Sequence, residues 1–487
     1  MNRLSSLAAI RGQARLPGYD PAAHGRGIVH LGIGAFHRAH QAVLTDDALA
    51  AAGGDWRITG VSLRSTAVAE AMNPQNGLYT LIERGAAGTS ARVIAAIRDV
   101  IAADPVATLA ALVDPAVRIV TLTVTEKGYG IDRATGLFDP EHPAVRADLA
   151  TPDAPSGALG LLVAALAARR RAGQAPFTVL SCDNLPENGR LLRGGVISFA
   201  RIQDPDLADW IAAEVAFPSS MVDRITPAPT DETLAEARRQ TGCTDLAAVE
   251  TEPFLQWVIE DRFPQGRPAW EAGGAIFVAD VAPYERMKLT MLNGSHSMLA
   301  YAGFLSGHRH VRDVMTDPAL ARLVARHLRA AAAELPALPG VDLATYAAAL
   351  EGRFRNPAIA HETYQIAMDG TQKLPQRIFQ PALSALAGGR PLAPFAFATA
   401  AWMRYALGQT DAGQPYDLRD PRAAEINAAL TAAPQEAGAI FDALSGLPGL
   451  MPDALRAAAD WRAAVVGPLA RMLAEGMQTA VRLEARA

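Results

Sequence analysis

The sequence has little of what marks a secreted, metal-binding or membrane protein. Only two cysteines occur among its 487 residues, Cys182 and Cys243, and neither lies in a Cys-x-x-Cys or Cys/His cluster. This argues against a disulfide framework and a structural zinc site. No apolar run approaches the length that spans a bilayer, and the N-terminus carries no sustained apolar segment. We therefore expect a cytoplasmic protein without a structural zinc site.

The sequence also lacks a large charge of one sign. Its net charge is −5, and no block of like charges occurs. Nucleic acid and anionic membrane surfaces are therefore poor candidates as partners. Hydrophobic residues make up 50% and charged residues 20%, which is typical of a globular protein. The length exceeds that of one ordinary core and favours two domains.

Residues 27–40 predict a buried strand, a glycine turn and a helix that begins near His37. In a Rossmann fold this turn binds a pyrophosphate, because glycine permits close approach of the backbone and the helix N-terminus offers free N–H groups. Gly32 and Gly34 occupy the first two glycine positions, followed by Ala35 and Phe36. His37 occupies the third position, so the motif departs from the rule. A plain strand-to-helix turn is the alternative interpretation.

The second predicted strand, residues 56–64, ends in Ser62-Leu63-Arg64. NAD-binding units usually end this strand with an acidic residue that binds the ribose hydroxyls. Because none is present, the strand does not decide between NAD and NADP. Arg64 can meet a 2′-phosphate or can be a solvated strand end.

Polar corners follow two further predicted strands. Residues 117–124 lead into Thr125, Glu126 and Lys127, and residues 177–182 lead into Asp183 and Asn184. Ligands of doubly wound sheets bind beyond the carboxyl ends of strands, so both corners are candidates for the site. Asn184 has an alternative role as the cap of a helix starting near Pro186.

Other segments complete the first domain. Residues 79–83 and 91–95 predict an inserted β-hairpin, and residues 159–172 predict a helix whose terminal Arg169-Arg170-Arg171 are solvated. Asp223 is either the partner of Arg224 in an ion pair or a carboxylate of the site.

Beyond Pro283 almost every pattern is helical. The predicted fold class is α/β, with a Rossmann-type dinucleotide-binding domain at 1–283 and a mainly α-helical substrate domain at 284–487. The helices predicted in the second domain cover residues 318–334, 343–354, 381–387, 395–407, 423–433 and 468–485.

The helix predicted over residues 284–301 carries an unusual polar face. At about 100° per residue, Glu285, Lys288 and His296 fall within one quadrant and Asn293 lies just outside it. Burial beside apolar residues lowers the pKa of a lysine, and an amine with a lowered pKa can serve as a general base near neutral pH. The alternative is an amphipathic helix with a solvated Lys and Glu.

Five ordered motifs together resemble the polyol-specific long-chain dehydrogenases, the family of mannitol 2-dehydrogenase and fructuronate reductase. The resemblance runs from about residue 27 to beyond residue 377. The motifs cover residues 32–41, 123–129, 181–184 and 221–227, followed by Lys288-x-x-x-x-Asn293-Gly294-x-His296.

The resemblance implies a metal-independent oxidoreductase that uses NAD, with Lys288 as general acid and base. It implies that Asn184 and Asn293 hold the reacting oxygen and that His296 orients the substrate. Asp223 matches a carboxylate that binds in the site, and Glu285 matches one that relays protons.

The motifs around residues 125–129, 293–297 and 369–377 look more like the fructuronate reductase branch. Gln365 stands where mannitol enzymes tend to carry Arg. A uronate needs a fixed cation, for which Lys127, Lys373 and Arg377 are candidates. We therefore expect reduction of D-fructuronate to D-mannonate with NADH, with mannitol or another hexitol or pentitol as the alternative substrate.

Two rival interpretations come from other classes. Tyr284-x-x-x-Lys288 matches the catalytic pair of short-chain dehydrogenases, although the glycine loop of that family is absent. A non-enzymatic sensor of sugar acids would keep the fold but would need no proton acceptor. The expected partner is a small molecule, and the expected assembly is a monomer or a homodimer.

Overall fold

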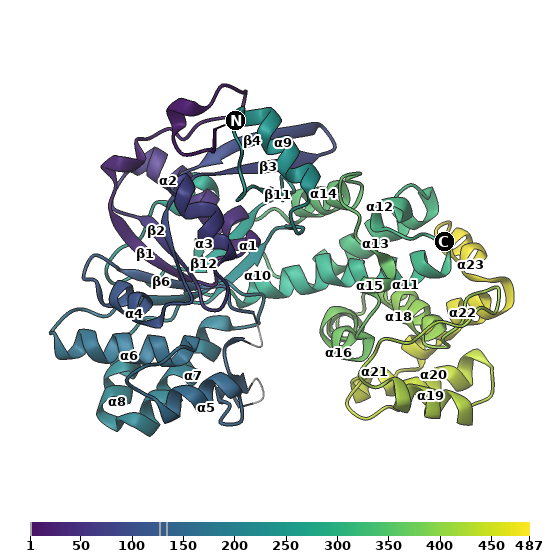
Figure 1. Cartoon of the computed structure of the whole chain (residues 1–487). Coiled ribbons are helices and arrows are strands. Elements are labelled where there is room, and N and C mark those ends of the chain that lie inside the picture. The colour runs from purple at the N-terminus through teal and green to yellow at the C-terminus, as the bar shows by residue number, and fades with distance from the viewer. Residues whose placement is uncertain (1, 126–127, 133–134) are drawn as a thin grey trace. The chain divides into compact units, whose positions relative to one another are not determined.

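The computed structural model describes residues 2–125, 128–132 and 135–487. The chain divides into two compact units, Met1–Ala282 and Pro283–Ala487. Figure 1 shows the strands gathered in the first unit and the second built of helices. This confirms the predicted fold class of an α/β domain followed by a mainly helical one.

A five-stranded parallel sheet forms the centre of the first unit, in the order β5-β2-β1-β6-β9. This is the doubly wound order, with neighbouring strands extending to both sides of β1. The carboxyl ends of β1 and β6 therefore form the switch point where ligands bind in such sheets. The strands are β1 Arg26–Leu31, β2 Arg57–Ser62, β5 Ile97–Ala102, β6 Ile119–Leu122 and β9 Thr178–Ser181.

Alternation along β1 separates two cores. Val29 and Leu31 face α4, α6, α7 and α8, whereas Ile28 packs with α2 and with two buried tryptophans, Trp257 and Trp270. The helices of this unit are α1 Ala35–Ala39, α2 Gln41–Ala52, α3 Ala67–Met72, α4 Pro105–Val113, α5 Pro143–Ala150, α6 Ala158–Arg171, α7 Asn188–Gln203, α8 Pro205–Glu214 and α9 Asp231–Thr241.

The end of α6 confirms the predicted solvation of Arg170 and Arg171 but not that of Arg169. Arg169 is buried and donates to the carbonyls of Ala175 and Leu112, each at 3.0 Å. Its guanidinium also lies over the ring of Phe177. The arginine stem fills a gap between α4 and β9, and backbone carbonyls satisfy its head.

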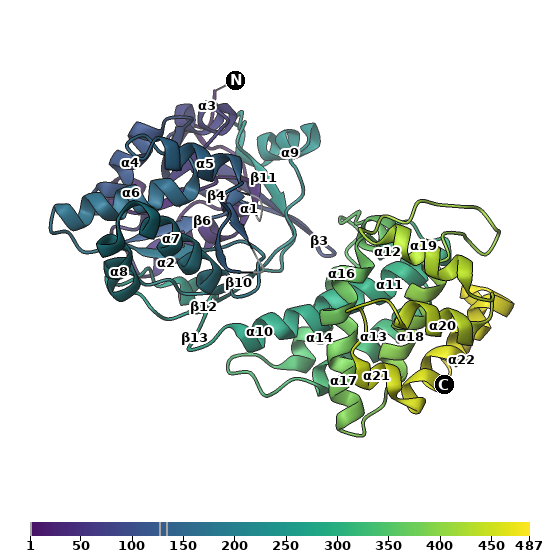
Figure 2. The same cartoon turned by 90° about the horizontal axis from the view of Figure 1, so that it is seen from below.

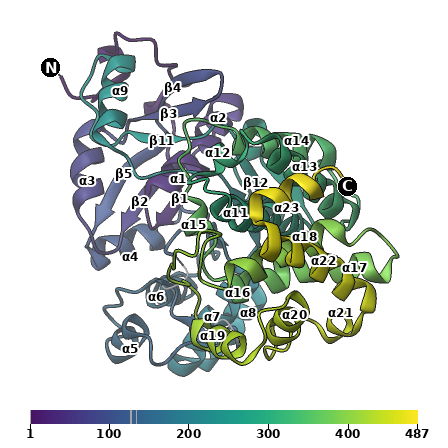
Figure 3. The same cartoon turned by 90° about the vertical axis from the view of Figure 1, so that its right-hand side faces the viewer.

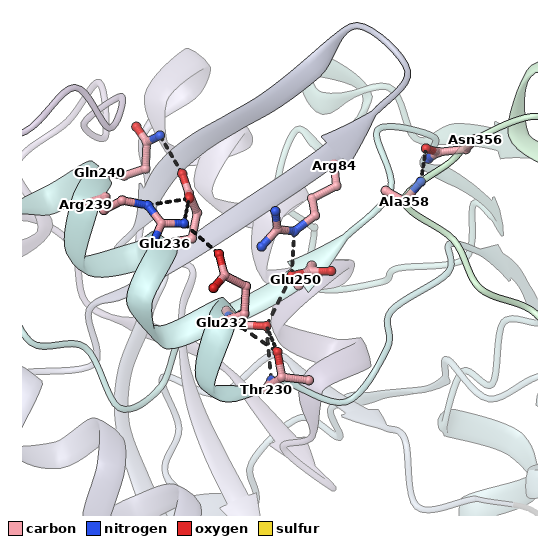
Figure 4. A network of polar contacts seen from close by, with 10 residues as sticks. Arg84, Thr230, Glu232, Glu236, Arg239, Gln240, Glu250, Asn356 and Ala358 are labelled. Atoms are coloured by element: carbon pink, nitrogen blue, oxygen red, sulfur yellow. Dashed lines mark hydrogen bonds and ion pairs between the residues drawn. The ribbon is translucent and has the colours of Figure 1, made fainter.

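Smaller sheets flank the main one. The predicted hairpin is present as β3 Tyr79–Gly85 and β4 Gly88–Ile94, with β11 Val249–Thr251 parallel to β3. Figure 4 shows Arg84 Nε of β3 paired with Glu250 Oε2 of β11 at 2.7 Å. Glu250 Oε2 also accepts a hydrogen bond from Thr233 Oγ1 of α9 at 3.2 Å, which joins this sheet to α9. The remaining strands are β7 Ile131–Asp132, β8 Leu137–Phe138, β10 Ser220–Asp223, β12 Gln256–Glu260 and β13 Ile276–Val278.

In the second unit α11 lies in the middle, packed against α13, α15 and α18 (Figure 2 and Figure 3). Two π-helical turns, η6 Lys288–Asn293 and η7 Pro375–Phe379, interrupt otherwise continuous helices. The helices are α10 Ala282–Met287, α11 Gly294–Leu305, α12 Val311–Val314, α13 Pro318–Ala333, α14 Leu343–Phe354, α15 Thr363–Ile366, α16 Gly370–Leu374, α17 Gln380–Ala387, α18 Ala393–Tyr405, α19 Ala423–Ala432, α20 Ala437–Ser445, α21 Asp453–Ala457, α22 Ala459–Glu475 and α23 Met477–Glu484.

The C-terminal helix differs from its prediction. Pro468 lies inside α22 rather than at its start, and Gly476, with φ of +80°, separates α22 from α23. The prediction of a single helix over residues 468–485 is therefore wrong. Proline often begins a helix, but Pro468 lies inside one, and the positive φ of Gly476 ends that helix.

Candidate active site

Gly32 is required by the backbone at the end of β1. Its φ is +97°, and a Cβ there would lie 2.2 Å from the carbonyl oxygen of Thr123 on the neighbouring chain segment. Its N–H donates to Val61 O at 2.8 Å. A side chain would therefore push the end of β1 away from β6.

Packing against the described residues does not require glycine at position 34. Gly34 is exposed and precedes α1, and of the described atoms a Cβ there would meet Gly32 O alone, at 3.8 Å. The open space in front of Gly34 and the N–H groups of Ala35 and Phe36 suit an approaching phosphate. Arg64 lies exposed just beyond β2, where a ribose or its 2′-phosphate is met in Rossmann folds. The residues present therefore fit a dinucleotide.

His37 explains the departure from the third glycine. Its ring stacks on that of His30 in β1, with centroids 3.4 Å apart and planes at 16°. His30 is held in turn by Thr121 Oγ1 at 2.7 Å and Thr123 Oγ1 at 2.8 Å. Burial lowers the pKa of His30 to about 3, so the ring is neutral. Stacked imidazoles thus join helix to strand where other Rossmann folds use a glycine.

Asp183 organises the corner that follows β6. Its carboxylate accepts from Val124 N at 3.0 Å, Thr125 N at 3.2 Å and Tyr129 Oη at 2.7 Å. Thr125 has φ of +68°, which is uncommon for a β-branched residue and is typical of a strained functional position. The candidates Glu126 and Lys127 lie outside the described residues.

Asn184 is exposed beyond β9. The helix after it begins at Asn188, with Glu187 as N-cap, so the structure does not show Asn184 as the cap near Pro186. Asn188 was missed by the sequence analysis: its buried amide donates to Asp183 O at 3.0 Å and Ser220 O at 2.8 Å. It thereby fixes the turn that presents Asn184.

Asp223 is the last residue of β10 and is buried. Its neighbour Arg224 forms an ion pair with Glu83 and donates to the carbonyl oxygens of Ala39 and Glu252. The partner of Arg224 in an ion pair is therefore Glu83, which lies in β3. Asp223 remains a candidate carboxylate of the site.

The π-helix η6 carries Lys288 at its first position and Asn293 at its last. The N–H of Gly294 donates to Leu289 O, five residues back, which defines the π-turn. Such turns contain more residues than the 3.6 of an α-helix, so the even 100° rotation assumed from the sequence does not hold here. Lys288 is 9% exposed, and Glu285 lies half-buried one turn before it.

The hydroxyl of Tyr284 makes a hydrogen bond to the backbone. It is buried, and its hydroxyl donates to Pro339 O at 2.6 Å. The short-chain dehydrogenase interpretation needs this hydroxyl at the reacting carbonyl. The geometry therefore gives that interpretation no support.

The second π-helix, η7, packs against η6. A Cβ on Gly294 would lie 2.9 Å from Arg377 O, so the two backbones approach closely at this glycine. Arg377 Nη1 lies 3.3 Å from Ser297 Oγ and 3.5 Å from Asn293 O, as a hydrogen-bond donor to both. The structure thus brings Arg377 beside the turn that carries Lys288 and Asn293.

His296 lies on α11, one turn beyond η6, between two rings. Its centroid is 4.7 Å from that of Phe354 and 5.6 Å from that of His361. Burial holds the pKa of His296 well below its usual value, and His361, Arg353 and Arg377 lower it further. At neutral pH this imidazole is uncharged and can both donate and accept a hydrogen bond.

The ammonium of Lys373 contacts residues that lie just before α16. Its Nζ donates to Met368 O at 2.5 Å and Ile366 O at 3.3 Å, and lies 3.7 Å from Asp369 Oδ2. Burial, followed by the charge of Arg377, lowers the pKa of Lys373. This ammonium is largely satisfied by the chain.

The described residues show neither a metal-binding group of side chains nor a helix that could span a membrane. They contain no group of three or more His, Cys, Asp or Glu side chains that could hold a metal ion. None of their helices is both long enough and apolar enough to cross a membrane.

Comparisons with known proteins match both halves of the chain. Residues 26–272 match the mannitol dehydrogenase Rossmann domain, and residues 280–447 match the mannitol dehydrogenase C-terminal domain. The chain is 43% identical to D-mannonate oxidoreductase of Escherichia coli over 475 residues, which cover 96% of this chain and 97% of that protein.

Two solved structures are similar over nearly the whole length. One is D-sorbitol dehydrogenase in substrate-free form, with TM-score 0.91 and 35% identity, covering 99% of this chain and 100% of that one. The other is mannitol 2-dehydrogenase of Pseudomonas fluorescens in complex with NAD and D-mannitol, with TM-score 0.79 and 37% identity, covering 100% and 99%. The resemblance inferred from the five motifs is confirmed.

Proposed function

The chain belongs to the mannitol dehydrogenase family of oxidoreductases, and from this premise we propose that it reduces D-fructuronate to D-mannonate with NADH. The observation that carries the choice of substrate is the similarity to D-mannonate oxidoreductase, which extends over 96% of the chain. The presence of NAD in the mannitol 2-dehydrogenase structure supports the choice of coenzyme.

The first unit would hold the coenzyme. Gly32 lets β1 and β6 stay together, and Gly34, Ala35 and Phe36 offer open backbone to the pyrophosphate. Thr125 would lie near the coenzyme at the switch point beyond β6. When bound, NADH supplies the hydride of the reaction.

The second unit would supply the proton. In the reducing direction the ammonium of Lys288 gives its proton to the ketone oxygen, and in the oxidising direction the neutral amine accepts the proton of the carbinol. The amides of Asn184 and Asn293 donate to the oxygen on which negative charge develops. His296 would orient a substrate hydroxyl, Glu285 would exchange the proton of Lys288 with solvent, and Asp223 would bind the sugar.

A hexitol is the second candidate substrate. The similarity to D-sorbitol dehydrogenase, with TM-score 0.91, and to mannitol 2-dehydrogenase favours it. Gln365 is exposed on α15, at the position where mannitol enzymes tend to carry Arg, and this departure favours the sugar acid.

The deciding experiment compares kcat/KM for fructuronate and fructose, each with NADH and with NADPH. We expect the highest value for fructuronate with NADH. A clear preference for fructose would place the protein in the mannitol branch. Faster turnover with NADPH would indicate that Arg64 binds a 2′-phosphate. A flat NADH absorbance with every ketose would favour a sensor without catalysis.

A further inference from the structure

Lys373 and Arg377 are two cations that lie four residues apart but differ in how far their hydrogen-bond donors are satisfied. Lys373 already has two carbonyl oxygens and the carboxylate of Asp369 around its Nζ. The guanidinium of Arg377 donates hydrogen bonds to the described part of the chain through Nη1 alone. This difference separates a structural cation from one that is available to a ligand.

The hydrogen bonds of Arg377 leave most of its guanidinium unused. Among the described residues only Nη1 has acceptors, Ser297 Oγ at 3.3 Å and Asn293 O at 3.5 Å, and both distances are long. Within residues 2–125, 128–132 and 135–487, neither Nε nor Nη2 has a hydrogen-bond partner, and no carboxylate forms an ion pair with the group. Nε and Nη2 form one edge of the guanidinium, the edge that binds a carboxylate through two parallel hydrogen bonds.

The surroundings of Arg377 favour an anion. The side chain is half-buried, and the charges of Arg353 and Lys373 belong to the same cluster around His296 and His361. Asp369, the carboxylate that acts on Arg377 from a distance, is already beside Lys373. A partly buried cation among other cations is stabilised when an anion joins it.

We propose that Arg377 is the specificity-determining residue that binds the carboxylate of a sugar-acid substrate through Nε and Nη2. This inference rests on the proposed function. The contact of Nη1 with Asn293 O places the carboxylate next to the turn that carries Lys288 and Asn293. Arg377 thus distinguishes a uronate from the neutral ketose of the same length, whose terminal hydroxyl cannot pair with a cation.

A purely structural role is the competing explanation, because Nη1 supports the π-helix η6. Arg377→Gln separates the two, since the amide keeps an N–H donor for Asn293 O and removes the charge and the fork. Arg377→Lys keeps the charge and removes the fork. Lys373→Met is the matched comparison, because it removes a cation of the same segment that the chain already satisfies.

The experiment measures kcat/KM for fructuronate and for fructose with NADH in the wild type and the three variants, together with their melting temperatures. In Arg377→Gln we expect about a 100-fold loss for fructuronate, as for a charged pair broken at a binding site, and less than about a threefold change for fructose. Arg377→Lys should fall between the wild type and Arg377→Gln. Lys373→Met should leave the ratio of the two substrates unchanged.

Equal losses on both substrates in Arg377→Gln would overturn the inference and assign Arg377 a structural role. Wild-type kcat/KM on fructuronate in Arg377→Gln would overturn it as well. The proposed function is tested by the wild type alone: if the wild type does not prefer fructuronate over fructose, that function fails whatever the variants do. Should Arg377→Gln fail to fold, addition of guanidinium ion to Arg377→Ala provides the test, since recovery is expected for fructuronate and not for fructose.

Discussion

The glycine turn of the first unit and the paired π-helices of the second differ in which residues they require. At the turn, the absence of side chains matters: Gly32 keeps two strands together and Gly34 leaves space. On η6 and η7, side chains matter, and a distorted helix sets their directions. The proposed coenzyme binding therefore depends on the backbone, the proposed chemistry depends on Lys288 and Asn293, and the proposed choice of substrate depends on Arg377.

This difference decides what could be predicted. Strand periodicity and the Gly32-x-Gly34 pair predicted the Rossmann-type unit, and helical periodicity predicted most of the second unit. The π-turns could not be predicted, because the extra residue in a turn depends on packing between η6 and η7 rather than on local propensity. Asp183 and Asn188 were missed as supporting residues, because their partners lie up to 59 residues away in the chain.

Removing the amine of Lys288 should have the largest effect on the helical side of this comparison. We expect Lys288→Ala to lose about 10²–10⁴-fold in kcat, the range for a positioned acid or base, while its Kd for NADH stays near that of the wild type. Stopped-flow kinetics and NADH fluorescence titration measure the two quantities. A parallel loss of NADH binding would show that the two regions are not separate in function.

Removing one amide from each unit tests whether both amides act on the same oxygen. We expect Asn184→Asp and Asn293→Asp each to lose about 10²–10³-fold in kcat, because each change keeps the shape and removes the donor. The double variant should lose less than the product of the two, since donors to one oxygen act as a unit. Steady-state kinetics of the three variants provide the check, and strictly multiplicative losses would indicate separate roles.

Substituting each of the two glycines by alanine distinguishes an effect on the stability of the fold from an effect on coenzyme binding. We expect Gly32→Ala to lower the free energy of unfolding by at least about 3 kcal/mol, since positive φ and a backbone clash add. Gly34→Ala should change it by less than about 1 kcal/mol and weaken NADH about tenfold, or about 1.4 kcal/mol. Urea unfolding and fluorescence titration measure both. Equal destabilisation of the two variants would refute the distinction.

The stacked imidazoles under the turn should give a small dependence of stability on pH. The pKa of His30 is about 3 in the folded protein and 6.5 in the unfolded chain, so the unfolded state binds more protons between these values. Stability is therefore unaffected above pH 6.5 and falls as the pH drops below it, by up to about 1.4 kcal/mol per pH unit for this group. His30→Gln should show a shallower slope in urea unfolding between pH 6.5 and 4.5. An equal slope would mean that His30 is not held neutral.

The central claim, that Lys288 exchanges the proton, is tested most directly by the pH dependence of kcat in both directions. The oxidation of mannonate needs the neutral amine and should rise with pH, whereas the reduction of fructuronate needs the ammonium and should fall through the same ionisation. We predict that the residual activity of Lys288→Ala shows neither limb of these pH profiles, that is, neither the rise in oxidation nor the fall in reduction. Limbs that persist unchanged in this variant would contradict the account.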